Sequence, residues 1–437
     1  MRKRRQLLVH KKANKSDTIK NTFNMNRINF KSLIHQRKFI VTISFVGLFL
    51  LSVGVSLIVF YFVSPKSASN LLSEISKKTK VNISLPKTEE CPINGAMYTT
   101  AESSVWSTRR PVIAMIENHQ DARPESGLSK ADVVYEAVAE GGITRFAGVF
   151  YCGASVGEVE AAPIRSARVY FINMAAGYGT DPIYLHQGGA NNICSTCPGG
   201  VKPTSQSNPK ANTVTLLEKL GWGGGPEGNN FDGGYNIGYP IVIRDQYRLD
   251  SNNASAWEHA VVANLDEVWK EAADRGYNYK DEDGVAWTKG FRKWLFQDGK
   301  SVSTPSATDI KFDFWSSMPG YDVEWKYDAT TNSYLRYNGG EKHIDWEFDK
   351  PQLSASNVAI MFVKETGPID TEHHMYYEVT GTGKSIVFQN GEAIEGTWEK
   401  DSALDREVFY DTNGDEIKMV RGATWVELVP STNEVTY

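Results

Sequence analysis

The stretch that decides the fold is Arg110-Pro111-Val112-Ile113-Ala114-Met115-Ile116-Glu117-Asn118. Its five consecutive apolar residues, between a proline and a polar exit, have the length and composition of a buried strand. Three further strand candidates and three predicted helices follow, at residues 132–138, 145–151 and 182–186, and at residues 168–176, 213–220 and 265–275. Strands that alternate with helices predict an α/β (or α+β) domain over residues 106–302.

The hydrophobic pattern changes to a period of two after about Val302. Val323, Trp325 and Tyr327 alternate with polar residues, as in a strand with one buried face. Asn-Gly pairs at residues 338–339, 390–391 and 413–414 are strong hairpin signals, because Asn and Gly readily adopt the positive φ of tight hairpin turns. Residues 303–437 are therefore predicted to form an antiparallel β domain.

An uncharged run of 25 residues, Phe39–Val63, precedes the predicted folded part. As a helix it would be about 37 Å long, enough to cross a hydrocarbon core of about 30 Å. It is too long for the apolar core of a signal peptide, and it ends in bulky residues. Residues 1–38 contain 12 Lys or Arg and a single acid. The positive-inside rule thus predicts a cytoplasmic tail (1–38), a transmembrane helix (39–63) in the plasma membrane, and an extracellular remainder.

Charge divides the chain unevenly. Removing the 12 basic and one acidic residue of the tail from the 47 and 52 of the whole chain leaves 35 basic and 51 acidic residues, a net charge near −16. Such a surface argues against nucleic acid as a partner. Residues 64–105, rich in Ser, Lys, Thr and Pro, are predicted to be an extracellular stalk. No Walker-type or dinucleotide-binding motif and no G-x-S-x-G elbow is present, so no cofactor is predicted.

All four cysteines follow the predicted membrane helix, on the side where disulfides persist: Cys91, Cys152, Cys194 and Cys197. Three pairings are possible, and sequence alone does not choose among them. A local bridge within Cys194-Ser-Thr-Cys197, with Cys91 paired to Cys152, is slightly favoured. Pro198-Gly199-Gly200 forbids the helix that a thioredoxin-like motif requires, and no metal site is predicted because the histidines are isolated.

Several motifs, in their order along the chain, resemble the YerB-like family of bacterial envelope proteins. They are residues 110–118, 122–128, 131–136, 140–146 and 163–168 in the first half, and residues 325–328, 388–391 and 424–430 in the second. The resemblance implies a two-domain exported protein, usually lipid-anchored, of unknown function and without established catalytic residues. This chain has Ala162 where the family usually has Gly, and Ala256-Trp257-Glu258-His259-Ala260 keeps only the histidine of an Ala-Pro-His-Asn motif.

The candidate site residues are four arginines at predicted strand ends and turns, together with two polar neighbours: Arg123, Arg145, Arg165, Arg168, Asn118 and His186. Arginine suits a bidentate grip on phosphate or carboxylate. One interpretation is an anion-binding pocket beneath the Gly-, Asn- and Pro-rich loop 198–240. The other is a structural network in which the arginines pair with Asp132, Glu136 and Glu140. His119 and His259, with Glu136 and Glu140, are secondary candidates for the site.

Two functions follow. The preferred one is a non-catalytic, membrane-anchored envelope protein that binds an anionic cell-wall glycan or an envelope protein. The alternative is a wall-assembly enzyme for phosphoryl or glycosyl transfer on a lipid-linked glycan, with Arg145, Arg165 and Arg168 on phosphate and His186 or an acid as base. No catalytic residue is assigned. Trp325, Trp346, Trp398 and Trp425 are either a sugar-stacking face or, as alternating strand tryptophans usually are, core.

Overall fold

The computed structural model describes residues 85–189, 211–222 and 227–437, and Ser52 by itself. The predicted cytoplasmic tail, all but one residue of the predicted membrane helix, and the Cys194–Cys197 pair lie outside the described residues. Among the residues that are described, no helix is long and apolar enough to cross a membrane. The described residues from 85 to 189, 211 to 222 and 227 to 437 belong to one compact unit.

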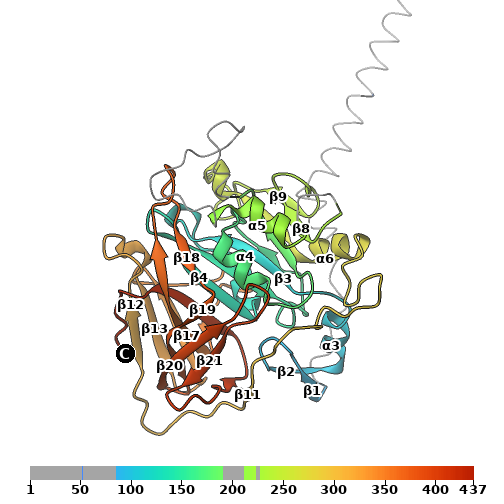
Figure 1. Cartoon of the computed structure of the whole chain (residues 1–437). Coiled ribbons are helices and arrows are strands. Elements are labelled where there is room, and N and C mark those ends of the chain that lie inside the picture. Colours follow the sequence, from blue (N-terminus) through green and yellow to red (C-terminus); the bar gives the residue numbers. More distant parts are fainter. Residues whose placement is uncertain (1–51, 53–84, 190–210, 223–226) are drawn as a thin grey trace, which may run out of the picture. The chain divides into compact units, whose positions relative to one another are not determined.

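A large mixed sheet organises this unit (Figure 1). Its strand order is β21 (Val408–Asp411), β20 (Glu392–Lys400), β19 (Gly381–Gln389), β17 (Asn357–Thr366), β23 (Thr424–Pro430), β4 (Val133–Glu140), β5 (Ile143–Phe150), β3 (Val112–Glu117), β7 (Ile183–His186) and β8 (Asn230–Asp232). β18 (Tyr376–Glu378) pairs with the end of β17. The run that opened the sequence analysis is β3, and all six of its residues are buried.

The strand β23 joins the two halves of the chain. It runs parallel to β17 on one side and to β4 on the other, with Thr424 opposite both Asn357 and Val133. All seven residues of β23 are buried, as expected for a strand with parallel neighbours covered on both faces. The sheet therefore crosses the predicted domain boundary at residues 302/303, and buried residues from Cys91 to Val429 form one hydrophobic cluster.

The first half is mostly β with few helices, so the predicted α/β (or α+β) class holds only in part. The helices α4 (Val169–Ala175), α5 (Thr213–Lys219) and α6 (Leu265–Asp274) lie where the sequence predicts them, but each has ten residues or fewer. β4 and β5 form an antiparallel hairpin through Gly141 and Gly142, both at positive φ. A turn this short cannot hold the crossover helix that parallel strands require. Figure 1 shows α4 and α5 side by side against the sheet.

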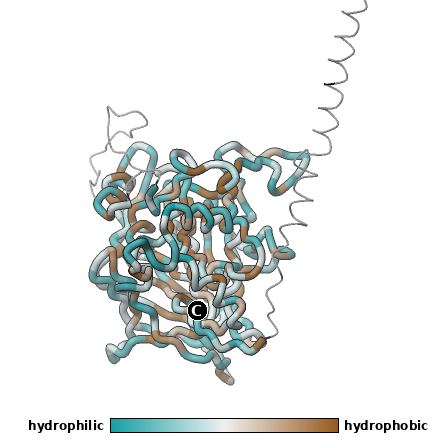
Figure 2. Tube along the Cα trace, turned by 90° about the vertical axis from the view of Figure 1, so that its right-hand side faces the viewer, coloured by the Kyte–Doolittle hydropathy of each residue, from teal (hydrophilic) through white to brown (hydrophobic). Residues whose placement is uncertain are grey.

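The second half follows the predicted period of two. A second sheet contains β12 (Asp309–Phe312), β13 (Val323–Asp328), β14 (Ser333–Asn338), β15 (Glu341–Lys342) and β16 (Ser354–Ala355). Trp325 of this sheet packs edge-to-face on Trp425 of β23, with ring centroids 5.3 Å apart. The two sheets therefore share a core. Figure 2 shows hydrophobic segments mainly in the interior and hydrophilic segments mainly along the outer loops.

The predicted stalk differs from the structure over its described part. β1 (Lys87–Glu90), β2 (Met97–Thr99) and α3 (Thr100–Trp106) are folded against the rest, and α3 starts with a capping box of Thr99 and Glu102. A disulfide joins Cys91 to Cys152, the pairing that the sequence slightly favours. Cys91 is fully buried. The polar composition of residues 64–105 does not reveal this folded segment. Its apolar contact with the rest of the fold is small, and the disulfide holds it in place.

The remaining elements are short. A three-stranded sheet contains β6 (Glu160–Ala161), β10 (Val261–Asn264) and β9 (Val242–Arg244), and β11 (Phe296–Gln297) pairs with β22 (Met419–Val420). The 3-10 turns are η1 (Gln120–Ala122), η2 (Leu128–Lys130), η4 (Trp257–His259) and η5 (Pro319–Tyr321). His119, the N-cap of η1, and His259, the last residue of η4, lie beside the end of β3, where the candidate site lies.

Candidate functional site

Three of the four predicted arginines meet at one end of β3, β4 and β5. Arg145 lies in β5 opposite Glu117, the last residue of β3. The segment before α4 runs along the end of β3, because the Arg165 amide donates to Met115 O (2.8 Å). That segment brings in Arg165 and Arg168. We call the resulting set Arg165, Glu117, Arg145, Glu140 and Arg168 the arginine row.

Glu140, at the end of β4, lies between two arginines. Its Oε1 accepts a hydrogen bond from Arg145 Nη2 (2.9 Å), and its Oε2 accepts one from Arg168 Nη2. Burial by itself would raise the pKa of Glu140, but the charges of Arg145 and Arg168 outweigh burial and hold this pKa well below its ordinary value. Glu140 is therefore a carboxylate at neutral pH.

Glu117 lies between an arginine and a histidine. Arg165 Nε donates to Glu117 Oε1 (2.9 Å), and His259 Nδ1 donates to Glu117 Oε2 (2.9 Å). Burial opposes ionisation of Glu117, but the hydrogen bond from His259 and the charges of Arg165 and Arg145 lower its pKa. The hydrogen bond to Glu117 in turn raises the pKa of His259, against the effect of burial.

The arginine row contains three guanidinium groups and two carboxylates, so it has a surplus of positive charge. Arg145 and Arg168 are 1% and 2% exposed, and the Nε of each is buried with no hydrogen-bond partner among the described residues. Buried donors without partners are costly. Arg165 differs, because 27% of its side chain is exposed. Among the described residues only its Nε has a partner, which leaves both terminal nitrogens available.

The structure does not bring Arg123 and Asn118 into this row. Asn118 Oδ1 accepts hydrogen bonds from Arg123 Nε and from Asn338 Nδ2 (2.8 Å each). Arg123 also donates to Gly320 O (2.8 Å) and lies over the Tyr321 ring. These two residues therefore connect the first half of the chain to the second.

His186, at the end of β7, is 2% exposed and engaged at both ring nitrogens. Nδ1 lies 2.7 Å from Gly188 O, and Nε2 lies 2.6 Å from Asn230 Oδ1. A ring held in this way positions the start of the glycine-containing loop. It has no free nitrogen to accept a proton from a substrate.

Glu136 belongs to a separate buried network, which sequence reasoning missed. Glu136 and Arg336 of β14 form an ion pair with both side chains fully buried. Arg336 Nη1 lies 2.8 Å from His343 Nδ1, and His343 Nε2 lies 2.8 Å from Glu125 Oε2. We call Glu136, Arg336, His343, Glu125 and the adjoining Glu427 the inner network. The signal in the sequence is the alternation itself, since Arg336 shares the buried face of β14 with Tyr334.

Asp132, the third acid predicted to pair with the arginines, binds backbone instead. It accepts the amides of Tyr151 and Cys152 (2.8 Å each) and Gly153 (2.9 Å). Burial raises the pKa of Asp132 to about 7, although these amides favour its charged form. Asp132 thus fixes the loop that carries Cys152 of the disulfide.

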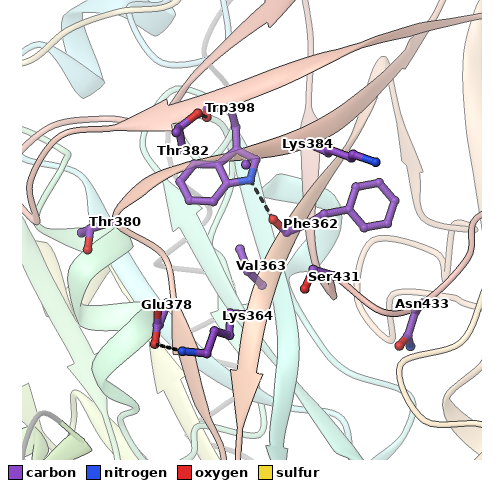
Figure 3. A pocket seen from close by; sticks show the side chains of 11 residues that line it. Phe362, Val363, Lys364, Glu378, Thr380, Thr382, Lys384, Trp398, Ser431 and Asn433 are labelled. Carbon is purple, nitrogen blue, oxygen red and sulfur yellow. Dashed lines mark hydrogen bonds and ion pairs between the residues drawn. The ribbon is translucent and has the colours of Figure 1, made fainter.

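A cavity of about 460 Å³ lies elsewhere, over β17, β19 and β20 (Figure 3). An adjoining cavity of about 410 Å³ shares Lys364, Ser431 and Asn433 with it. Lys364 is paired with Glu378 (2.9 Å), whereas Lys384 has no ion-pair partner among the described residues. Trp398 lines this cavity but is 2% exposed, and its Nε1 donates to Phe362 O (2.9 Å).

The four predicted tryptophans do not form a sugar-stacking face. Trp325, Trp398 and Trp425 are at most 2% exposed and belong to the core. Trp346 is half-buried beneath Lys350. Three of the four are therefore core residues, which is the usual role of tryptophans that alternate along a strand.

Comparison with known proteins agrees with this architecture. Residues 98–212 match the N-terminal domain, and residues 310–426 the C-terminal domain, of a protein family of unknown function, DUF3048. The chain is 28% identical over 324 residues to a Bacillus subtilis (strain 168) protein named "Putative lipoprotein YerB", covering 74% of this chain and 82% of that protein. The crystal structure of the YerB protein from Bacillus subtilis matches with a TM-score of 0.60 and 25% identity, covering 80% of this chain and all of that one. The chain therefore belongs to the YerB-like DUF3048 family, whose function is unknown.

Proposed function

We propose that this protein is a non-catalytic envelope protein, held on the outer side of the plasma membrane by residues 39–63, that binds an anionic cell-wall component at Arg165. The uncharged run behind a basic tail supports the membrane anchor and its orientation. The lipoprotein name of the Bacillus subtilis relative supports an envelope location. In this chain the helix would take the place of the lipid anchor.

The observation that carries the binding proposal is the partial pairing of Arg165. Its Nε is fixed on Glu117, so the planar guanidinium is already oriented, while both terminal nitrogens are available among the described residues. A guanidinium presents such nitrogens as a fork that fits phosphate or carboxylate oxygens. Arg145 and Arg168 add positive charge behind it. A ligand anion would neutralise the surplus that the row now carries.

The acidic surroundings make the site selective. The part of the chain beyond residue 63 has a net charge near −16, so an anion meets repulsion over most of the surface. A local positive surplus is then the place where an acidic wall polymer can bind.

Binding is better supported than group transfer. A general base works best when its pKa lies near the operating pH. The pKa values of Glu117 and Glu140 are lowered by their cationic neighbours, and His186 has both ring nitrogens engaged. Glu117, Glu140 and His186 are therefore poorly matched to act as the base in phosphoryl or glycosyl transfer.

The test measures binding of full-length protein in detergent micelles to three purified polymers: a glycerol-phosphate wall polymer, a uronic-acid polymer and a neutral glucan. We expect the wild type to bind one or both anionic polymers and not the glucan. Arg165→Ala should weaken this binding by about 10-fold to 100-fold, the worth of a charge-assisted hydrogen bond. Arg165→Lys, which keeps the charge but not the fork, should recover only part of it.

Lys384→Ala is the matched control, because it removes an unpaired cation from the cavity of Figure 3. Loss of polymer binding in Lys384→Ala but not in Arg165→Ala would overturn the proposal in favour of that cavity. Turnover of a lipid-linked glycan by the wild-type protein would contradict the non-catalytic proposal and support the alternative function as a wall-assembly enzyme.

A further inference from the structure

A cluster of two histidines and an aspartate lies beside the arginine row. His119, Asp121 and His259 each place a potential metal-ligand atom within 4.8 Å of one in both of the others. The described residues contain one other group of this kind, Cys91, Asp132 and Cys152, but its two cysteines are used in the disulfide. In the cluster of His119, Asp121 and His259 the ligand atoms are not bonded to one another, and the cluster is partly open to solvent.

We propose that His119, Asp121 and His259 bind a divalent metal ion of the zinc type. Imidazole nitrogens with a carboxylate oxygen are a donor set that zinc accepts in proteins. The inference does not rest on the proposed polymer binding, because it uses none of the arginine nitrogens.

His259 is arranged as a metal ligand commonly is. Its Nδ1–H donates to Glu117 Oε2 (2.9 Å), and Glu117 is itself held by Arg165. A histidine that ligates through one ring nitrogen usually donates its other N–H to a carboxylate, which fixes the tautomer and the ring orientation. Nε2 of His259 is then the nitrogen with a free lone pair. His259 is 8% exposed, so the ring is also fixed by packing.

His119 and Asp121 bring the other two donors from η1. His119 is the N-cap of this turn, and its Nδ1 accepts the Asp121 amide at 3.2 Å, a long hydrogen bond. The two imidazoles stack with centroids 4.7 Å apart and an angle of 16° between the ring planes. Asp121 Oδ2 lies 3.8 Å from His119 Nδ1. The three donors thus lie close together. Because the two rings are nearly parallel, their in-plane lone pairs converge on one ion only after the partly exposed His119 ring turns.

Closing this cluster around an ion requires the His119 ring to turn and the Asp121 side chain to shift. Ligand atoms at about 2.0–2.2 Å from zinc lie roughly 3.3–3.6 Å apart in a tetrahedral site. The Asp121 side chain is 79% exposed and that of His119 is 32% exposed, so both have room to move. Three protein ligands leave a fourth position for water or for an anionic ligand atom.

The test uses full-length protein in detergent after removal of metal by chelator. Zinc binding is measured by calorimetry, and Co²⁺ is used as a spectroscopic probe of tetrahedral coordination. All proteins carry Cys194→Ser and Cys197→Ser, because that pair lies outside the described residues and is itself able to bind zinc. We expect one zinc per chain and visible-range Co²⁺ absorption.

Asp121→Asn and His119→Ala should each weaken zinc binding more than about 10-fold and change the Co²⁺ spectrum. Glu117→Gln should weaken zinc binding about 10-fold to 100-fold, while tetrahedral Co²⁺ coordination persists. His373→Ala, which removes an exposed histidine outside the cluster, should leave both unchanged. Asp121 is exposed, so Asp121→Asn keeps the test valid even if a buried variant fails to fold. Unchanged affinity and spectrum in Asp121→Asn and His119→Ala would overturn the proposal, and so would absence of zinc binding by the parent protein.

Discussion

The arginine row and the inner network are built from the same residue types but differ in charge balance and exposure. In the inner network Glu136 and Arg336 form a fully buried ion pair that links β4 to β14. In the arginine row three arginines share two carboxylates, and the side chains of Arg165 and Glu140 are each 27% exposed. The comparison teaches that a fully buried ion pair stabilises the fold, whereas a surplus of positive charge at a partly exposed edge is available to a ligand.

The largest effect is expected from Arg336→Met. It leaves Glu136 buried without its cation, and breaking a buried ion pair costs about 3–5 kcal/mol. Chemical denaturation of the purified protein at pH 7 measures the loss in the free energy of unfolding. An unchanged free energy of unfolding would mean that the inner network does not hold the two halves together.

A smaller loss is expected from Glu140→Gln in the arginine row. The variant leaves Arg145 and Arg168 facing a neutral group, and hydrogen bonds between charged groups contribute about 1.5–3 kcal/mol. Because the folded-state pKa of Glu140 is lowered, its stabilisation is present above its unfolded pKa of about 4.3 and is lost as pH falls through the folded value. Unfolding measured from pH 7 down to pH 3 should therefore show a shallower acid decline in Glu140→Gln than in the wild type.

Glu427→Gln should show the opposite pH dependence. Burial and the neighbouring charge of Glu136 raise the pKa of Glu427 well above its ordinary value. The folded state then keeps this proton longer than the unfolded state, so stability falls as pH rises from about 4.3 through the folded pKa. Glu427→Gln can retain the hydrogen bond from Trp325 Nε1 and should remove that fall. Relative to the wild type, the stability of Glu140→Gln should increase as pH falls from 4 to 3, and that of Glu427→Gln should increase as pH rises from 4 to 9. The two regions would not be distinguished if both variants gained stability relative to the wild type in the same direction of pH.

The smallest effect on stability is expected from Arg165→Ala, about 1 kcal/mol, because the buried Glu117 keeps its hydrogen bond from His259 when Arg165 is removed. The same variant is expected to have the largest effect on polymer binding. A thermal melt measured alongside the binding assay separates the effect on stability from the effect on polymer binding. A loss of stability as large as that of Arg336→Met would place Arg165 with the inner network.

Local patterns predicted much of the fold. The apolar run 112–116 is a buried strand, residues 323–327 alternate in β13, and the Asn390-Gly391 turn has positive φ at both residues. The α/β (or α+β) prediction for the first half holds only in part. Its strands pair antiparallel in β4–β5 and β5–β3 and parallel in β3–β7, and β4 also pairs with β23, which comes from the far end of the sequence. Which strands pair over such separations is not visible in a local period.

Only part of the candidate site could be predicted from the sequence, because some of its contacts join residues that are far apart in the chain. Arg145, Arg168 and Glu140 were singled out, and they lie together. The partner of Glu136 is 200 residues away, so no spacing rule indicates Arg336. Glu117 is not among the predicted site residues, although it is the acid that orients both Arg165 and His259.

The position of β23 has a consequence for how the protein is made. Until residues 424–430 have been synthesised and have crossed the membrane in the proposed orientation, β4 and β17 each have one edge without its native partner. Open edges of apolar strands are prone to pair with other chains. The first half therefore cannot complete its sheet until the last strand is available, and a chain that stops before Thr424 would keep one unpaired edge on β4 and one on β17. Insertion of β23 is thus the step that closes the sheet between the two halves of the chain.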